Sequence, residues 1–175
     1  YHRHLDAAAR RLAERLGTEA SLLVDLGCGS GASTAALLRH VRDARVVGID
    51  ASAGMLAQAQ SKQWPAGVEF HHLPAQRLAE LDLAPVDGVM AAYLLRNLNG
   101  SDRDRVLATI LDGLRPGGWL VLQEYSVAGR RRAGLVWTLH DRLGRAGFTG
   151  VEQLAVTGWQ RGILHTFLAQ RPHRP

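Results

Sequence analysis

The sequence predicts an α/β fold in which helices cover both faces of a mostly parallel, seven-stranded sheet. Three observations lead to this prediction. Short apolar runs alternate with helical patterns through the first five strand units. A glycine-rich turn at Gly27, Gly29 and Gly31 joins the first apolar run to a helix. The final two apolar runs follow each other without a helix, so the last strand is expected to be antiparallel. Alternating strands and helices favour parallel strands joined by crossover helices.

Periodicity and capping residues place the elements of the first half of the chain. Gly17 is positioned to end the first helix, Ser52 to cap the third, and Pro74 to end the third strand. The expected elements are a helix at His2–Leu16, a strand at Ser21–Leu26, a helix at Ala32–Val41, a strand at Arg45–Asp50, a helix at Ala53–Lys62, a strand at Val68–His72 and a short helix at Ala75–Leu81.

In the second half of the chain, strands and helices continue to alternate up to the last helix, and two strands then follow each other. Ser101 is positioned to cap a helix, and Pro116-Gly117-Gly118 is expected to turn the chain into the fifth strand. The expected elements are a strand ending at Ala92, a helix at Asp102–Leu114, a strand at Trp119–Tyr125, a helix at Leu135–Ala146, and strands at Val151–Val156 and Ile163–Ala169. The last two are expected to form a hairpin-like antiparallel pair.

Length and composition bound the class of protein. The 175 residues, of which 46% are hydrophobic, are enough for one domain over 1–175 with a sizeable core. We divide it into an N-terminal helix (1–20), a core containing the glycine turn (21–125), and a C-terminal helix with two strands (126–175). No apolar run is long enough to span a membrane and no signal peptide is evident, so we expect a cytoplasmic protein.

Charge and residue spacing argue against several functions. The net charge is +5, and its densest run, Arg130–Arg132, has no interleaved aromatic residues. A solvated loop is therefore a better interpretation of this run than a nucleic-acid surface. Cys28 is the single cysteine, and no spacing of His, Cys and carboxylates indicates a metal site.

The glycine turn and the next strand together indicate a ligand. Glycines at alternate positions let the backbone turn sharply and bring a ligand close to bare amides at a helix start. Asp50 ends the following strand, at about the ~20-residue separation at which doubly wound folds place a ribose-binding carboxylate. The spacing G-x-G-x-G is one residue shorter than the G-x-G-x-x-G of dinucleotide binders. This argues against a nicotinamide-dependent oxidoreductase.

Three motifs now resemble a known family. Asp25–Gly31, Gly48–Leu56 and Leu114–Gly118 look like the ordered motifs of class I S-adenosylmethionine-dependent methyltransferases. The resemblance spans about residues 21–125. It implies that these residues form the cofactor-binding core of a Rossmann-like fold. It implies S-adenosyl-L-methionine as methyl donor and S-adenosyl-L-homocysteine as product. Within the class, Tyr93–Leu98 resembles the Arg-Asn stretch of the ubiquinone and menaquinone C-methyltransferases. Gln123–Ser126 and Gly158–His165 resemble that group as well.

The resemblance assigns cofactor-binding positions residue by residue. The Gly27–Gly31 backbone would hold the methionine end, and Asp25 would order this turn or meet the ammonium group. Asp50 would accept hydrogen bonds from both ribose hydroxyls. Met55 would pack against adenine, although a place in the core is an equal alternative. The full expected set is Asp25, Gly27, Cys28, Gly29, Gly31, Asp50, Ala51, Met55, Ala75, Gln76 and Ala91.

One position departs from the family. Where the family commonly carries Asp-Ala after the third strand, to bind the adenine amine, this chain has Pro74-Ala75-Gln76. Proline supplies neither a side-chain acceptor nor an N–H. The loss of a charge-assisted contact costs about 1.5–3 kcal/mol unless Gln76 replaces it. We therefore expect cofactor binding weaker than is usual for the family.

The acceptor side is predicted with less detail. The resemblance implies a small, aromatic or quinol-type acceptor. Arg96 would hold a phenolate or order a water molecule, Asn97 would position the acceptor, and Tyr93 would form a wall of the pocket. An ion pair of Arg96 with Asp102 is an equally weighted structural alternative. A quinol would bring transient membrane contact. The segment 126–134 is short for the helices that roof the substrate in quinone methyltransferases. Two alternatives therefore stay open: O-methylation of another metabolite or carrier-bound acid, and a non-catalytic cofactor-binding module.

Overall fold

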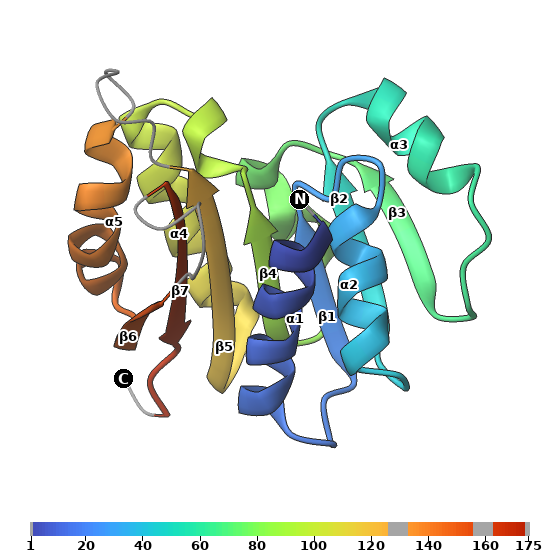
Figure 1. The fold of residues 1–175 in the computed structure, drawn as a ribbon, viewed down its shortest axis with the longest axis horizontal. Coiled ribbons are helices and arrows are strands. Elements are labelled where there is room, and N and C mark those ends of the chain that lie inside the picture. Colours follow the sequence, from blue (N-terminus) through green and yellow to red (C-terminus); the bar gives the residue numbers. More distant parts are fainter. Residues whose placement is uncertain (1, 126–132, 156–162, 174–175) are drawn as a thin grey trace.

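A computed structural model describes residues 2–125, 133–155 and 163–173. Seven strands form one sheet in the order β3-β2-β1-β4-β5-β7-β6 (Figure 1). The strands are β1 Leu22–Leu26, β2 Arg45–Asp50, β3 Val68–His72, β4 Val86–Ala92, β5 Leu114–Tyr125, β6 Thr149–Leu154 and β7 Leu164–Gln170. The helices are α1 His2–Leu16, α2 Ala32–His40, α3 Ala53–Gln60, α4 Gly100–Gly113 and α5 Ala133–Ala146, with 3₁₀ turns η1 Ala75–Leu81 and η2 Leu95–Asn97.

Strand pairing confirms the predicted topology. β1 pairs in parallel with β2 and with β4, and the parallel set extends to β3 and β5. β7 is antiparallel to both β5 and β6, as predicted for the last strand. The chain builds outward from β1 in one direction to β3 and in the other to β5. Such a reversal leaves a crevice at the carboxyl ends of the central strands, where α/β folds bind ligands.

Alternate residues of the central strands supply two cores. Val24 packs into the cluster that α4 and α5 cover, whereas Leu23 packs into the cluster beneath α1 and α2 (Figure 1). Both side chains are fully buried. Because β1 is covered on both faces, its sequence is a nearly continuous apolar run. Asp25 interrupts this run, and its burial is the first indication of a special role.

The expected starts of α4 and β5 were wrong. Asn99, not Ser101, caps α4, since its Oδ1 accepts the Asp102 N–H at 2.9 Å. Ser101 instead donates its hydroxyl to the same oxygen. The Pro116–Gly118 turn lies inside β5 as an irregularity: Leu114 pairs with Val86, but Trp119 pairs with Gly88. The glycines let the backbone bend there without leaving the sheet.

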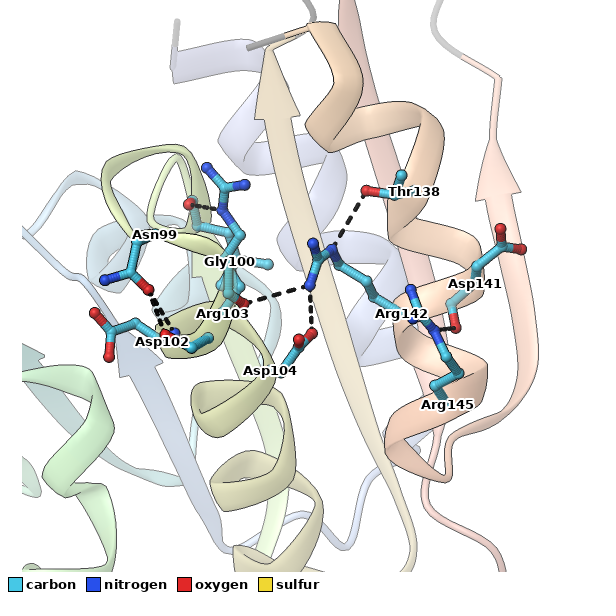
Figure 2. A network of polar contacts seen from close by, with 11 residues as sticks. Asn99, Gly100, Asp102, Arg103, Asp104, Thr138, Asp141, Arg142 and Arg145 are labelled. Atoms are coloured by element: carbon cyan, nitrogen blue, oxygen red, sulfur yellow. Dashed lines mark hydrogen bonds and ion pairs between the residues drawn. The ribbon is translucent and has the colours of Figure 1, made fainter. Parts of the chain in front are cut away.

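Helices α4 and α5 are joined by polar contacts on their outer surface (Figure 2). Arg142 of α5 reaches the Asp104 carboxylate and the Gly100 carbonyl at the start of α4. These contacts fix the end of α4 that adjoins η2. The Arg130–Arg132 run, the larger part of the short 126–134 segment, and the turn over 158–162 lie outside the described residues.

Candidate functional site

The glycine turn between β1 and α2 requires its glycines. Gly27, Gly29 and Gly31 have φ values of 79°, 54° and 87°, in the left-handed region. A Cβ on Gly31 would lie 2.7 Å from the ring of Trp64, closer than carbon atoms can approach. Trp64 was not predicted to contribute here. Its indole N–H donates to the Ala59 carbonyl at 2.8 Å, which fixes the ring over the turn.

Asp50 connects the glycine turn to the end of β2. Its Oδ2 accepts the Gly29 N–H at 2.8 Å, and its Oδ1 accepts the Ser52 N–H at 2.8 Å. The Ile49 carbonyl accepts the N–H groups of Gly27 and Cys28 at 2.7 and 3.0 Å. An ionised carboxylate has about four acceptor positions, so Asp50 retains capacity for two further donors. This capacity fits the two hydroxyls of a ribose.

Asp25 is fully buried beneath this turn. Its Oδ2 accepts the hydroxyls of Ser33 at 2.8 Å and Thr34 at 2.6 Å, and its Oδ1 has no partner among the described residues. Burial raises the pKa of Asp25 to about 6, although the two hydroxyl hydrogen bonds oppose the increase. The side chain thus holds the first turn of α2 in place. Its two expected roles, ordering the glycine turn or meeting the ammonium group, stay predictions.

A cleft of about 380 Å³ opens at the carboxyl edge of the sheet. Its lining brings together five of the expected cofactor-binding residues and two of the expected catalytic ones. The lining residues are Gly27, Ile49, Asp50, Ala51, Ser52, Ala75, Gln76, Tyr93, Leu94, Asn97 and Leu98. Ala91 is fully buried within β4, so its side chain lies away from the cleft surface.

Met55 and Cys28 differ in exposure. The Met55 side chain is 39% exposed, and its Cε lies 3.1 Å from the position that a Cβ on Gly29 would occupy. A core role for Met55 was therefore wrong, because it covers the turn from outside. Cys28 is buried, and burial together with the charges of Asp25 and Asp50 raises the pKa of its thiol well above the usual range. The thiol therefore stays protonated and unreactive.

Tyr93 forms a wall between the cleft and a cationic group. Its ring stacks on Tyr125, with centroids 4.9 Å apart and planes 16° apart. The guanidinium carbon of Arg96 lies 5.6 Å from the Tyr93 centroid and 5.9 Å from that of Tyr125. Both distances lie within the ~6 Å reach of cation–π attraction, which holds the cation at the stacked pair. The alternative ion pair with Asp102 was wrong, since Asp102 pairs with Arg105 at 3.3 Å.

Backbone strain at Tyr93 is held by the neighbouring strand. Tyr93 has a φ of 59°, which is costly for a bulky residue. Its N–H donates to the Gln123 carbonyl at 2.7 Å, and its hydroxyl donates to Gln123 Oε1 at 3.1 Å. Gln123 in turn donates to the His4 carbonyl and the Thr166 hydroxyl. Helix α1 and strand β7 thereby fix the orientation of the wall.

The catalytic candidates share the turn at the end of β4. Asn97 is exposed, and its Nδ2 donates to the Tyr93 carbonyl at 3.1 Å, so it stabilises the strained turn. Glu124 supports the same turn from β5: its Oε1 accepts the Leu95 N–H at 2.7 Å. Sequence reasoning gave no role to Gln123 and Glu124, although two polar residues at the end of an apolar strand were a usable signal. A strand buried on both faces keeps polar side chains only where they have partners.

This geometry fits a nucleoside-containing ligand in a doubly wound fold, and comparisons with known proteins agree. Residues 23–118 match the family described as "Methyltransferase domain". The chain therefore belongs to this methyltransferase family, and the class expected from the three motifs is confirmed. Within the described part of the chain, none of the helices is long and apolar enough to cross a membrane.

Among curated proteins, the chain is similar to a trans-aconitate 2-methyltransferase of Azoarcus sp. (strain BH72). The two are 40% identical over 117 residues, which are 66% of this chain and 44% of the relative. It is also similar to a carboxy-S-adenosyl-L-methionine synthase of Photorhabdus laumondii, with 32% identity over 81% of this chain and 58% of the relative. The chain thus spans about half the length of these relatives.

Solved structures confirm the fold. The N-methyltransferase NodS from Bradyrhizobium japonicum superimposes with a TM-score of 0.75 at 22% identity, over 97% of this chain and 96% of NodS. A didemethyltoxoflavin N1-methyltransferase from Burkholderia thailandensis, solved with S-adenosylhomocysteine, gives a TM-score of 0.73 at 22% identity, over 96% and 78% of the two chains.

Proposed function

We propose that this protein is an S-adenosylmethionine-dependent methyltransferase that acts on a small acceptor with an acidic oxygen. One observation carries the proposal: the glycine turn, Asp50 and the Tyr93 wall enclose a single cleft in a chain of this family. The donor supplies a methyl group on a positively charged sulfur. The protein has mainly to align donor and acceptor, which can contribute about 7–11 kcal/mol.

We assign the donor to the cleft by the chemistry of its lining. The Gly27–Gly31 turn would carry the methionine end on its backbone, and Asp50 would bind the ribose. Ala75 and Gln76 line the part where adenine is expected. Tyr93 would form one wall of the space in which the donor methyl group meets the acceptor, and would keep water out of that space.

For the acceptor we favour an aromatic, quinol-type molecule. The stacked pair Tyr93–Tyr125 offers a flat apolar surface, and Arg96 beside it would stabilise a phenolate. The same motifs that resemble the ubiquinone and menaquinone C-methyltransferases support this choice. Methylation at carbon would then follow deprotonation of the ring hydroxyl, which makes the ring carbon nucleophilic.

A carboxylic acid is the second candidate acceptor. Arg96 would hold a carboxylate as well as a phenolate. The names of two relatives support this alternative, since one methylates trans-aconitate and the other forms a carboxylated donor. A carboxylate oxygen would then receive the methyl group.

The test is methyl transfer from methyl-labelled S-adenosylmethionine to a panel of hydroquinones, phenols and carboxylic acids. Label bound to carbon supports the quinol acceptor, and label bound to oxygen supports the acid. Arg96→Gln is expected to lower turnover at least about tenfold, since it removes a charged contact. Arg105→Gln, an exposed arginine on α4, is the matched control and should leave turnover unchanged. Donor binding without turnover on any acceptor would favour a cofactor-binding module instead.

A further inference from the structure

Glu124 is a carboxylate placed entirely inside the protein, and one of its two oxygens has no hydrogen-bond partner among the described residues. It is 0% exposed at the end of β5. Its Oε1 accepts the Leu95 N–H at 2.7 Å, whereas its Oε2 has no hydrogen-bond partner among the described residues. A proton can therefore be added at Oε2 without breaking the bond that holds the η2 turn.

Arg96 lies on the same η2 turn and carries a buried hydrogen-bond donor that has no acceptor among the described residues. This donor is its Nε, and Asp102, the partner in the alternative interpretation, is engaged by Arg105. Arg96 nevertheless acts electrostatically on Glu124, where its positive charge works to lower the pKa of the carboxyl. Among the described residues, Arg96 is thus a cation whose buried Nε has no acceptor, and its charge acts on the buried carboxylate of Glu124.

We propose that the methyl acceptor is an anion held by Arg96, and that its binding is linked to the uptake of a proton by Glu124. The inference rests on the proposed function, because it concerns the acceptor half of the same site. It adds a charge requirement for the substrate and a dependence of substrate binding on pH.

The linkage follows from two charge states of Glu124. When Glu124 is ionised, it offsets the charge of Arg96, and an arriving anion meets a second negative charge at low dielectric. When Glu124 is protonated, Arg96 acts on the anion alone. Reciprocity then requires that anion binding favour protonation of Glu124 by the same factor. Burial raises the pKa of Glu124 to about 7, so the two states exchange near neutral pH.

The other charged groups around Glu124 come from two neighbouring elements. Arg103 of α4 donates its Nε to the Leu95 carbonyl at 2.8 Å and, being a guanidinium, stays charged at every relevant pH. His165 of β7 stands opposite Glu124 in the strand register, with Nδ1 2.8 Å from Gln153 Nε2. From α5, the described buried side chains Leu139 and Leu143 are apolar. His165 is therefore an ionisable side chain whose contribution the experiment must separate from that of Glu124.

The experiment measures binding of benzoate and its neutral isostere benzamide to the protein saturated with S-adenosylhomocysteine, by calorimetry. Benzoate stays ionised between about pH 5.5 and about pH 8.5, the range that spans the Glu124 transition. We expect benzoate to bind about tenfold more weakly at the upper pH, within the usual range of coupling between sites. Benzamide should bind equally at both. Near pH 7, benzoate binding should take up protons, detected by repeating the titration in buffers of different ionisation enthalpy.

Three variants separate the roles. Glu124→Gln keeps an oxygen for the Leu95 N–H, and it should bind benzoate with the low-pH affinity at every pH and without proton uptake. His165→Gln should retain the wild-type pH dependence. Arg96→Gln should lose benzoate binding at both pH values while still binding S-adenosylhomocysteine.

Several results would overturn the inference while leaving the proposed function in place. These are pH-independent benzoate binding by the wild type, a pH dependence that persists in Glu124→Gln, and no benzoate binding by a protein that binds S-adenosylhomocysteine. Failure of the wild type to bind S-adenosylhomocysteine would instead overturn the proposed function itself. Binding of S-adenosylhomocysteine by each variant shows that it has folded.

Discussion

Replacing Asp25 by asparagine is expected to stabilise the protein above neutral pH, although it removes a carboxylate from the centre of the site. The wild-type side chain is fully buried, and its Oδ2 accepts the hydroxyls of Ser33 and Thr34. The Thr34 backbone N–H also acts to lower the pKa of Asp25. Its Oδ1 has no partner among the residues described. Asparagine has nearly the same shape and can accept both hydroxyls at its one oxygen, without a buried charge.

The magnitude follows from the pKa of Asp25. Burial raises this pKa from its ordinary 3.8 to about 6, against the opposing hydrogen bonds from Thr34 and Ser33. A group whose pKa is raised by folding contributes stability that is complete below about pH 3.8 and lost as pH rises through about 6. A difference of about two pH units, at about 1.36 kcal/mol each, corresponds to about 3 kcal/mol. Burial of the new amide group reduces the expected gain to about 1–3 kcal/mol at pH ~8.

The assay is urea unfolding of wild type and Asp25→Asn at about pH 4.5 and about pH 8. The variant should match the wild type at the lower pH and exceed it at the higher one. A loss of stability that is equal at both pH values would refute the reasoning. It would show that the hydroxyl contacts contribute more than the buried charge costs.

Asp87 is the matched control, because it is also a buried aspartate but its pKa is lowered rather than raised. Burial works to raise its pKa, but the N–H groups of Leu22 and Ser21 and the Arg115 guanidinium outweigh burial and lower the pKa. A lowered pKa means stability that is present at neutral pH and lost as pH falls. Asp87→Asn should therefore destabilise the protein at pH ~8, the reverse of Asp25→Asn.

Three further predictions concern the glycine turn and the cleft. Asp50→Ala should weaken S-adenosylhomocysteine binding at least about tenfold by calorimetry, because it releases the turn and removes the ribose acceptors; unchanged affinity would exclude Asp50 from the site. Gly31→Ala should cost about 1–3 kcal/mol in thermal unfolding, since its Cβ would collide with Trp64. The control Gly54→Ala, with open space around it in α3, should be neutral or stabilising. Pro74→Asp should tighten S-adenosylmethionine binding about ten- to a hundredfold if the missing adenine contact limits affinity, and a sub-micromolar dissociation constant for the wild type would contradict that premise.

The local sequence determined most of the architecture. Apolar runs such as the one ending at Leu26, and the helical periods between them, specified the order of elements. The glycine spacing and Asp50 predicted where a ligand would bind, because those features act over a few residues. Boundaries were less certain where two capping residues compete: Asn99 and Ser101 are both suitable, and the hydrogen bond to the Asp102 N–H decides between them.

Only the tertiary structure decided the chemistry of the acceptor side. Arg96 could pair with Asp102 or face the site, and packing places it against Tyr93 and Tyr125 rather than against Asp102. Met55 could be core or surface, and the path of α3 leaves it over the turn. The properties of Asp25 and Glu124 depend on how completely other segments cover them. The desolvation of a carboxylate depends on every atom that the folded chain packs around it, including atoms from residues distant in sequence. The raised pKa values of these two carboxylates therefore cannot be read from their neighbours in the sequence.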